Sequence, residues 1–369
     1  MNKYQTYKLA GRILALDSFP YHRELIISCL QKSEIIWEKF VKLADYHLVL
    51  QTLYPKIRDH ELEIYFPEEV LEHLKHIFDL TSSRNQEVIK QVEDLTSVLH
   101  KSGIPPLYMK GVGNILDGLY RYPGERILHD IDILVPEPEF INAANLLLAN
   151  GYQSNYSFNS HVDNVERHYP ILYKPGEPVY VELHRMPVGN SYTGIFNTEM
   201  VFKSAKKPGF SENCLVMSDE HKIIHNFIHA QLDHKASIYA RDLVRNFYDL
   251  LLFSGRADPE RVFSDFGHYR RTTSGYLDIA YDTFGYYPSE RKLPEIFLHT
   301  YRFRYQLNLK SRLTETISYL LIRIFLGWVV KPFKAIFNRK LRRRLIDDLG
   351  NPEWYRKQKR YYGKILGIR

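Results

Sequence analysis

A chain of 369 residues that is 44% hydrophobic and 25% charged can bury a sizeable core, and its length suggests two or three structural units. Its two cysteines, Cys29 and Cys214, form no Cys-x-x-Cys pattern, which argues against a disulfide framework and a cysteine-based zinc site. Residues 301–369 have a net charge of +14 and the other 300 residues a net charge of −7, which argues against a body that coats nucleic acid.

The first hundred residues are predicted to be mostly helical. The N-terminus has no long apolar run that ends in small residues, so we expect no signal peptide and a cytoplasmic protein. Residues 25–54 repeat apolar side chains at intervals of three and four. A second helical run begins after Pro67 and stops near Gly103. We assign residues 1–100 to an N-terminal helical region.

Strands and helices alternate between residues 101 and 190. A short apolar run at 105–111 precedes a helix, and residues 129–137 alternate polar and apolar side chains before a proline. Residues 139–152 are predicted to be a helix, and residues 170–187 two strands around a Lys-Pro-Gly turn. This segment therefore predicts the small sheet core of an α+β protein.

Helices return from Ser218, so residues 191–300 are assigned to a C-terminal helical region and residues 301–369 to a basic, aromatic tail. Four histidines in the helical region, His221, His225, His229 and His234, are expected to pack between helices, because no His-Glu-x-x-His pattern accompanies them. Asp249 is expected to pair with Arg245, four residues before it on the same predicted helix.

The run Asp130-Ile131-Asp132-Ile133 carries the chemistry of the predicted sheet. On a strand the two aspartates point the same way, about 7 Å apart, while the isoleucines point into the core. Glu182 repeats this pattern between Val181 and Leu183 on a later strand. If the two strands are neighbours, three carboxylates converge and can hold a hard cation such as Mg²⁺. Such a site suits in-line transfer at a phosphorus atom.

These motifs resemble the nucleotidyltransferase superfamily of the DNA polymerase β type. More narrowly, they resemble a poorly characterised bacterial nucleotidyltransferase-like family, over roughly residues 25–290. The resemblance rests on Lys110-Gly111 at a helix start, Arg126 before Asp130-Ile-Asp132-Ile-Leu-Val, and Glu182 followed by His184. One position departs from the wider superfamily, because Val112 stands where glycine or serine is usual.

The resemblance implies a small mixed sheet and transfer of a nucleoside monophosphate from an NTP to an unknown hydroxyl acceptor, with release of pyrophosphate. Asp130, Asp132 and Glu182 would be the catalytic and metal-binding residues, with Mg²⁺ or Mn²⁺ as cofactor. The expected nucleotide-binding residues are Lys110, Gly111, Arg126 and His184. For Arg126, an ion pair with Asp130 is the structural alternative. Because of Val112, the alternative function is a catalytically inactive module that binds a nucleotide or a partner.

The tail offers a separate hypothesis. Residues 317–330 are apolar but contain Arg323, and they are too short to span a bilayer core of about 30 Å. Residues 331–344 place apolar side chains at helical spacing among seven basic residues. The pattern is typical of a helix that lies on an anionic membrane surface, here the inner face of the membrane. Packing on the acidic body and contact with RNA through interleaved tyrosines are the other interpretations.

Overall fold

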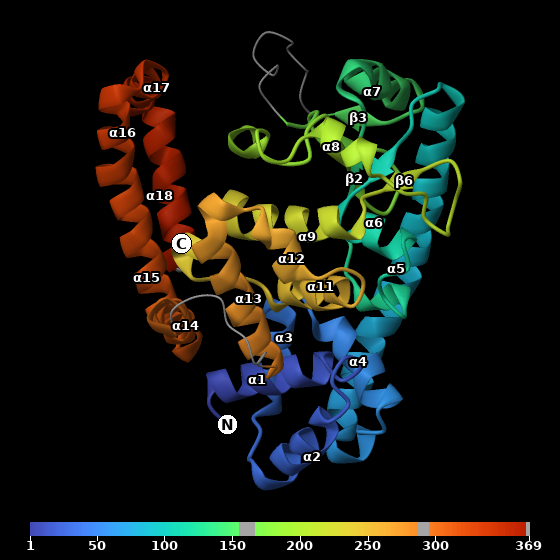
Figure 1. The fold of residues 1–369 in the computed structure, drawn as a ribbon, viewed down its shortest axis with the longest axis vertical. Coiled ribbons are helices and arrows are strands. Elements are labelled where there is room, and N and C mark those ends of the chain that lie inside the picture. The colour runs from blue at the N-terminus through green and yellow to red at the C-terminus, as the bar shows by residue number, and fades with distance from the viewer. Residues whose placement is uncertain (155–166, 287–294, 367–369) are drawn as a thin grey trace.

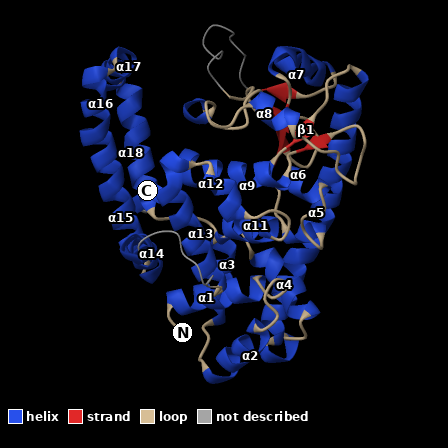
Figure 2. Ribbon diagram, viewed as in Figure 1, coloured by secondary structure: helices blue, strands red, loops and turns tan. Residues whose placement is uncertain are grey.

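A computed structural model describes residues 1–154, 167–286 and 295–366. These residues form an α+β fold in which helices surround a six-stranded mixed sheet, as the sequence predicts. The strands gather in one part of the molecule, whereas helices make up most of the rest (Figures 1 and 2). The predicted boundaries of the four parts, at residues 100, 190 and 300, stay predictions.

The N-terminal residues form five helices instead of the two predicted runs. They are α1 (Lys3–Leu14), α2 (His22–Lys32), α3 (Trp37–Tyr46), α4 (Leu50–Asp59) and α5 (Glu68–Lys101). The run predicted at 25–54 is broken twice, and at the second break Leu48 has a φ of 57°, which no helix continues through. The second predicted helix is confirmed as α5.

Six short strands make the sheet. They are β1 (Leu107–Tyr108), β2 (Asp130–Leu134), β3 (Gln153–Ser154), β4 (Leu172–Tyr173), β5 (Tyr180–His184) and β6 (Leu215–Val216). Their order is β3-β4-β5-β2-β1-β6. The pairs β2–β5 and β1–β6 are parallel and the other pairs antiparallel. The longest two strands, β2 and β5, are therefore neighbours at the centre of the sheet.

The side chains of β2 and β5 alternate between an apolar and a polar face. Ile131, Ile133, Val181 and Leu183 are fully buried in one hydrophobic cluster with Val92 and Leu95 of α5 and with Leu147 of α7 (Phe140–Ala149). The opposite face of the two strands carries the acids and His184. α5 and α7 thus cover the apolar face and leave the polar face for a site.

The C-terminal helices close around the N-terminal helices and the polar side of the sheet. They are α8 (Thr198–Lys203), α9 (Asp219–Phe227) with a π-helical continuation (Ile228–Asp233), α10 (Ala236–Tyr239), α11 (Val244–Ser254), α12 (Pro259–Ser264) and α13 (Arg270–Phe284). α6 (Lys110–Leu116) lies earlier in the chain, between β1 and β2. α1 packs tightly on α13, where a Cβ on Gly11 would lie only 2.1 Å from the Thr283 carbonyl oxygen. The two ends of the helical body therefore share one core.

The tail forms α14 (Glu295–Lys310), α15 (Arg312–Phe325) with a π-helical continuation (Leu326–Val330), α16 (Lys331–Phe337), α17 (Arg339–Gly350) and α18 (Pro352–Leu366). α14 packs into the core of the body, where Tyr305 and Leu309 are buried, and α15 contacts the body through Glu315 and Tyr319. Figure 1 shows α15, α16 and α18 along one side of the molecule, with α17 at their far end. None of the described helices is long and apolar enough to cross a membrane.

A buried ion pair fixes the loop that leads into β2. The Lys56 ammonium lies 2.9 Å from a carboxylate oxygen of Glu125, and both side chains are almost fully buried. The same Glu125 oxygen accepts a hydrogen bond from the Tyr248 hydroxyl at 2.7 Å. Thr52 and Gln51 donate to the Glu125 carbonyl. The loop is thus held by α4 on one side and by α11 on the other.

Removal of the Glu125 carboxylate should destabilise the whole fold. In Glu125→Ala, Lys56 would stay buried with only the half-exposed Asp17 as a partner. Because an unpaired buried charge is costly, we expect the free energy of unfolding to fall by about 3–5 kcal/mol in denaturant titrations. The control is Glu38→Ala, which breaks an exposed pair with Lys42 and should leave the melting temperature unchanged. Equal stability of the two variants would contradict this role of Glu125.

Candidate functional site

The register of β2 and β5 brings two carboxylates side by side. Asp132 lies directly opposite Glu182 in the parallel pair, and Asp130 lies opposite Tyr180. Asp132 is buried and Glu182 is half-buried. The convergence of acids expected from neighbouring strands is therefore present for Asp132 and Glu182, and Asp130 lies on the same face two residues before Asp132.

Lys110 neutralises this pair of acids. Its ammonium lies 2.5 Å from a carboxylate oxygen of Asp132 and 4.0 Å from one of Glu182. Lys110 follows β1 and opens α6 with a φ of 50°, in the left-handed region that side chains with a Cβ rarely adopt. Such backbone strain clusters at functional sites, so its position favours a functional role for Lys110 over that of a surface lysine.

His184 completes the cluster from the end of β5. Its Nε2 atom lies 2.9 Å from the same oxygen of Asp132 and 3.4 Å from Glu182. Burial alone raises the pKa of Asp132, but Lys110 and His184 outweigh it and hold that pKa well below its usual range. The hydrogen bond from His184 likewise lowers the pKa of Glu182. Both carboxylates are therefore ionised at neutral pH.

Asp130 is in a different electrostatic position. Burial raises the pKa of Asp130, the neighbouring Asp132 raises it further, and Lys110 offsets part of this effect. Asp130 has no hydrogen bond or ion pair with the residues that the structure describes. The two aspartates of the motif thus differ: Asp132 is stabilised as a carboxylate and Asp130 is not.

A divalent cation fits the donor atoms present. Asp132, Glu182 and His184 each offer an atom, and these atoms lie within 4.8 Å of one another. Two carboxylates and one imidazole suit Mg²⁺ or, because of the nitrogen, Mn²⁺. Asp130 is outside this group, although its carboxylate is on the same face. The Lys110 ammonium now supplies the positive charge that the two acids require.

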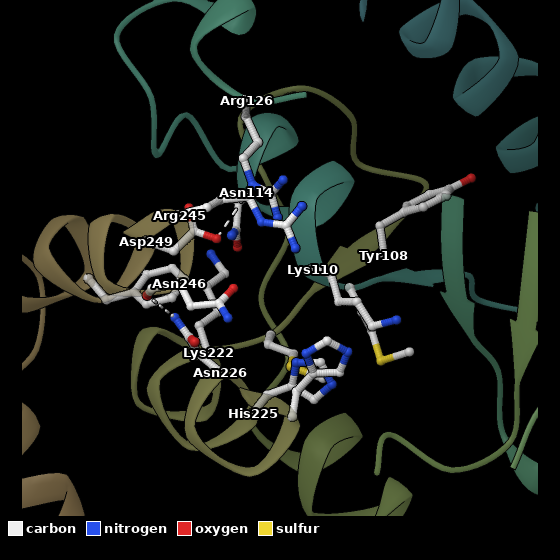
Figure 3. A pocket seen from close by; sticks show the side chains of 14 residues that line it. Tyr108, Lys110, Asn114, Arg126, Lys222, His225, Asn226, Arg245, Asn246 and Asp249 are labelled. Atoms are coloured by element: carbon white, nitrogen blue, oxygen red, sulfur yellow. Dashed lines mark hydrogen bonds and ion pairs between the residues drawn. The ribbon is translucent and has the colours of Figure 1, made fainter. Parts of the chain in front are cut away.

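A polar pocket lies beside the acids, between the sheet and the helical body (Figure 3). The charged side chains in its lining are four cations and one acid: Lys110, Arg126, Lys222, Arg245 and Asp249. Lys222 is already paired with Asp117 outside the pocket. Amides and histidines complete the polar lining: Asn114, His225, Asn226, His229 and Asn246. The pocket is therefore suited to an anion.

Two arginines from different elements, Arg126 before β2 and Arg245 of α11, meet in this pocket next to Asp249 (Figure 3). Nε of Arg126 lies 3.4 Å from a carboxylate oxygen of Asp249, and the Nε atoms of both Arg126 and Arg245 are buried without a hydrogen-bond partner. Burial, and then the nearby Arg126, lower the pKa of Arg245 to about 10. Among the described residues, no carboxylate lies within ion-pair distance of Arg245.

Two pairings differ from the prediction. Arg126 pairs with Asp249 rather than with Asp130, because the loop held by Glu125 turns its side chain toward α11. Asp249 also accepts a hydrogen bond from the Tyr120 hydroxyl at 2.7 Å. It does not form the ion pair with Arg245 that the sequence predicts. Arg245 was identified from the sequence only as a structural partner. Nothing near it in the sequence resembles a phosphate-binding motif, and only the fold brings it to the pocket.

The glycines near Lys110 allow close packing. A Cβ on Gly111 would lie 2.7 Å from the Leu128 side chain and 3.6 Å from the Arg126 guanidinium. A Cβ on Gly113 would lie 2.3 Å from the Tyr108 carbonyl oxygen. Val112 is buried in the sheet core and is absent from the pocket lining. The departure at Val112 therefore leaves the polar face of the site unobstructed.

The histidines of the helical region do not form a metal site with three donors among the described residues. His225 is buried, and its Nε2 atom lies 3.0 Å from the Pro187 carbonyl oxygen. The Nε2 atoms of His229 and His234 lie 3.2 Å apart. Burial lowers the pKa of His225 to about 3, so it is neutral and packs between elements as predicted.

A family described as uncharacterised nucleotidyltransferases matches residues 33–270 of the chain. The match includes the whole sheet, the cluster of Asp132, Glu182 and His184, and α11 with Arg245. Comparison with curated proteins and with solved structures finds no match.

The two aspartates should respond oppositely to neutralisation. From the sequence we expect an unchanged or higher melting temperature for both Asn variants, because like charges repel. With the structure, we expect an unchanged or higher melting temperature for Asp130→Asn only. Asp132→Asn should lower the free energy of unfolding by about 1–3 kcal/mol, since it removes the ionised partner of Lys110. Thermal unfolding of both variants at neutral pH measures this, and a more stable Asp132→Asn would contradict the ion pair.

Proposed function

This chain belongs to the family of uncharacterised nucleotidyltransferases, and on that premise we propose that it moves a nucleoside monophosphate from an NTP to a hydroxyl acceptor. The observation that carries the proposal is the pairing of Asp132 with Glu182 on adjacent parallel strands, beside a pocket lined by cations. An acidic centre next to a cationic pocket matches what a metal-bound triphosphate needs.

Asp132 and Glu182, with Asp130 on the same face, would hold Mg²⁺ or Mn²⁺. The bound ion would polarise the donor phosphate and neutralise the charge that develops on the leaving pyrophosphate. His184 orients Asp132 through its Nε2 atom and so fixes the direction of that carboxylate. Both paired acids are ionised at neutral pH, as cation binding requires.

The donor phosphates would extend from the acids into the pocket. Lys110 lies at the boundary between the two, bonded to Asp132 and lining the pocket. If Asp132 helped to hold a divalent ion, the Lys110 ammonium would be available to a phosphate oxygen. Arg126 and Arg245 lie further along and supply fixed, planar donors for phosphate oxygens. This assignment keeps Lys110 and Arg126 among the nucleotide-binding residues and adds Arg245.

In the proposed step, an acceptor hydroxyl oxygen forms a bond to the α-phosphorus, and the bond from that phosphorus to the bridging oxygen of pyrophosphate breaks. Glu182 accepts the hydroxyl proton, because it is ionised and more exposed than Asp132. The arginines bind the donor phosphates equally before and during the reaction, so they contribute to NTP binding.

One observation favours a second function, a nucleotide-binding module without turnover. The Lys110 ammonium already neutralises Asp132 at 2.5 Å, as a bound cation would. If this pair persists when a nucleotide binds, the protein holds the nucleotide but does not activate it. Pyrophosphate release separates the two functions, whereas nucleotide binding alone does not.

The activity is tested by incubating the protein with each labelled NTP, Mg²⁺ or Mn²⁺, and a cell extract that supplies acceptors. We expect labelled acceptor and pyrophosphate with the native chain and none with Asp132→Asn or Glu182→Gln, because each loses a metal-binding carboxylate. Arg245→Gln should instead raise KM for the NTP about 10–100-fold and keep kcat, since it removes a charge-assisted contact worth about 1.5–3 kcal/mol.

The matched control is Arg261→Gln, which removes an exposed arginine of α12 and should leave both kinetic constants unchanged. The proposal fails if folded native protein releases no pyrophosphate from any NTP with either metal. Turnover that survives in both carboxylate variants would place the reaction elsewhere in the molecule.

A further inference from the structure

The last four helices of the chain form an arm that exposes a series of large apolar side chains. We use the name C-terminal arm for residues 312–366, which comprise α15 to α18. The arm is joined to the body at its base, where Glu315 lies 2.8 Å from the Arg241 side chain and accepts a hydrogen bond from the Tyr46 hydroxyl. Beyond this base, α15, α16 and α18 lie along one another at the side of the molecule, with α17 at their far end (Figure 1).

Contacts inside the arm use its polar and aromatic side chains. The Tyr319 and Tyr361 hydroxyls are hydrogen-bonded, and the Arg323 guanidinium lies 3.9 Å from the centre of the Tyr361 ring. Lys331 pairs with Asp348 at 3.6 Å. These contacts join α15 and α16 to the returning helices and do not involve the exposed apolar side chains of α15 and α16.

Those side chains form a continuous stripe. They recur at intervals of mostly three or four residues from α15 through the π-helical segment to α16, so they lie on one face of a continuous helical stretch. The apolar stripe consists of Leu313, Ile317, Leu321, Ile324, Trp328, Phe333, Ile336 and Phe337. Each of these side chains is at least 46% exposed, and Phe337 reaches 79%. An apolar surface of this length is rare on a monomer without a partner.

The charge beside the stripe identifies the kind of partner. Residues 316–346 contain eight lysines and arginines and no acidic residue. Lys334, Arg339, Arg342 and Arg343 are exposed near the end of the stripe that carries Phe333 and Phe337. Apolar side chains that enter the acyl region, flanked by cations at the level of the headgroups, are what an anionic bilayer binds.

We propose that the C-terminal arm docks this protein on an anionic membrane surface, with the apolar stripe inserted among the lipids and the neighbouring basic residues on the headgroups. RNA offers phosphates but nothing that would bury eight large apolar side chains. A second copy of the chain would bring two strongly basic arms together. The proposal concerns a surface remote from the acids of the sheet and does not depend on the proposed activity.

Co-sedimentation of the full-length chain with vesicles tests the proposal. Vesicles of phosphatidylcholine with phosphatidylglycerol should bind the protein at low salt, more weakly at high salt, and vesicles of phosphatidylcholine alone should bind little. The double variant with Phe333→Ser and Phe337→Ser should bind the anionic vesicles at least about tenfold more weakly than the native chain. Ile64→Ser is the matched control, because Ile64 is an 84% exposed apolar residue on the helical body.

Tryptophan fluorescence of the native chain provides a readout that does not depend on how the double variant folds. Anionic vesicles should shift the emission to shorter wavelength, and Trp328→Phe should remove most of that shift. The proposal is overturned if the native chain ignores anionic vesicles. It is also overturned if the double variant stays folded and binds them as the native chain does. A third contradicting result is that the same substitutions abolish binding to single-stranded RNA or a concentration-dependent dimer while vesicle binding persists.

Discussion

The parallel pairing of β2 with β5 is the constraint on which the site depends. It sets Asp132 opposite Glu182, and two carboxylates on adjacent strands repel unless a cation lies between them. Lys110 meets that need in the structure, at the cost of a strained backbone conformation. The apolar residues that alternate with these acids bury the other face of both strands, so the register cannot slip without exposing the core.

The helical body completes the site rather than merely covering it. Glu125, locked to Lys56 and Tyr248, fixes the loop that carries Arg126. Asp249 of α11 forms an ion pair with Arg126, and Arg245 of the same helix lies beside them in the pocket. A short sheet with acids on one face thereby gains a pocket of opposite charge. The buried pair that stabilises the fold thus also positions Arg126, the side chain that we propose binds a donor phosphate.

Alternation of polar and apolar residues was enough to predict β2, β5 and their acids, and the helices predicted after residues 105–111 and at 139–152 correspond to α6 and α7. The sequence could not show that β2 and β5 are neighbours, because 45 residues separate them and register depends on tertiary contacts. For the same reason it missed the partner of Arg126 and the place of Arg245. The prediction of one helical run at residues 25–54 is wrong, because the periodic apolar pattern continues through the two breaks that separate α2, α3 and α4. The pattern reports burial, which all three resulting helices share.

The same limits apply to the tail. Composition identified a basic, amphipathic segment, and the acidic body favoured packing against the body over docking on a membrane surface. The structure divides these interpretations between helices: α14 is packed into the core, whereas the apolar stripe of α15 and α16 is exposed. The protein thus combines an inward-facing site on the sheet with an outward-facing apolar surface on the C-terminal arm.

The central claim is that Asp132 and Glu182 hold a divalent ion that releases Lys110 to the donor phosphates. Anomalous diffraction from crystals grown with Mn²⁺ and a non-hydrolysable NTP analogue tests it most directly. The account predicts a manganese peak bonded to both carboxylates, a Lys110 ammonium that has left Asp132 for a phosphate oxygen, and phosphates against Arg126 and Arg245. A nucleotide bound with no manganese between the acids and with the Lys110–Asp132 pair intact would contradict it.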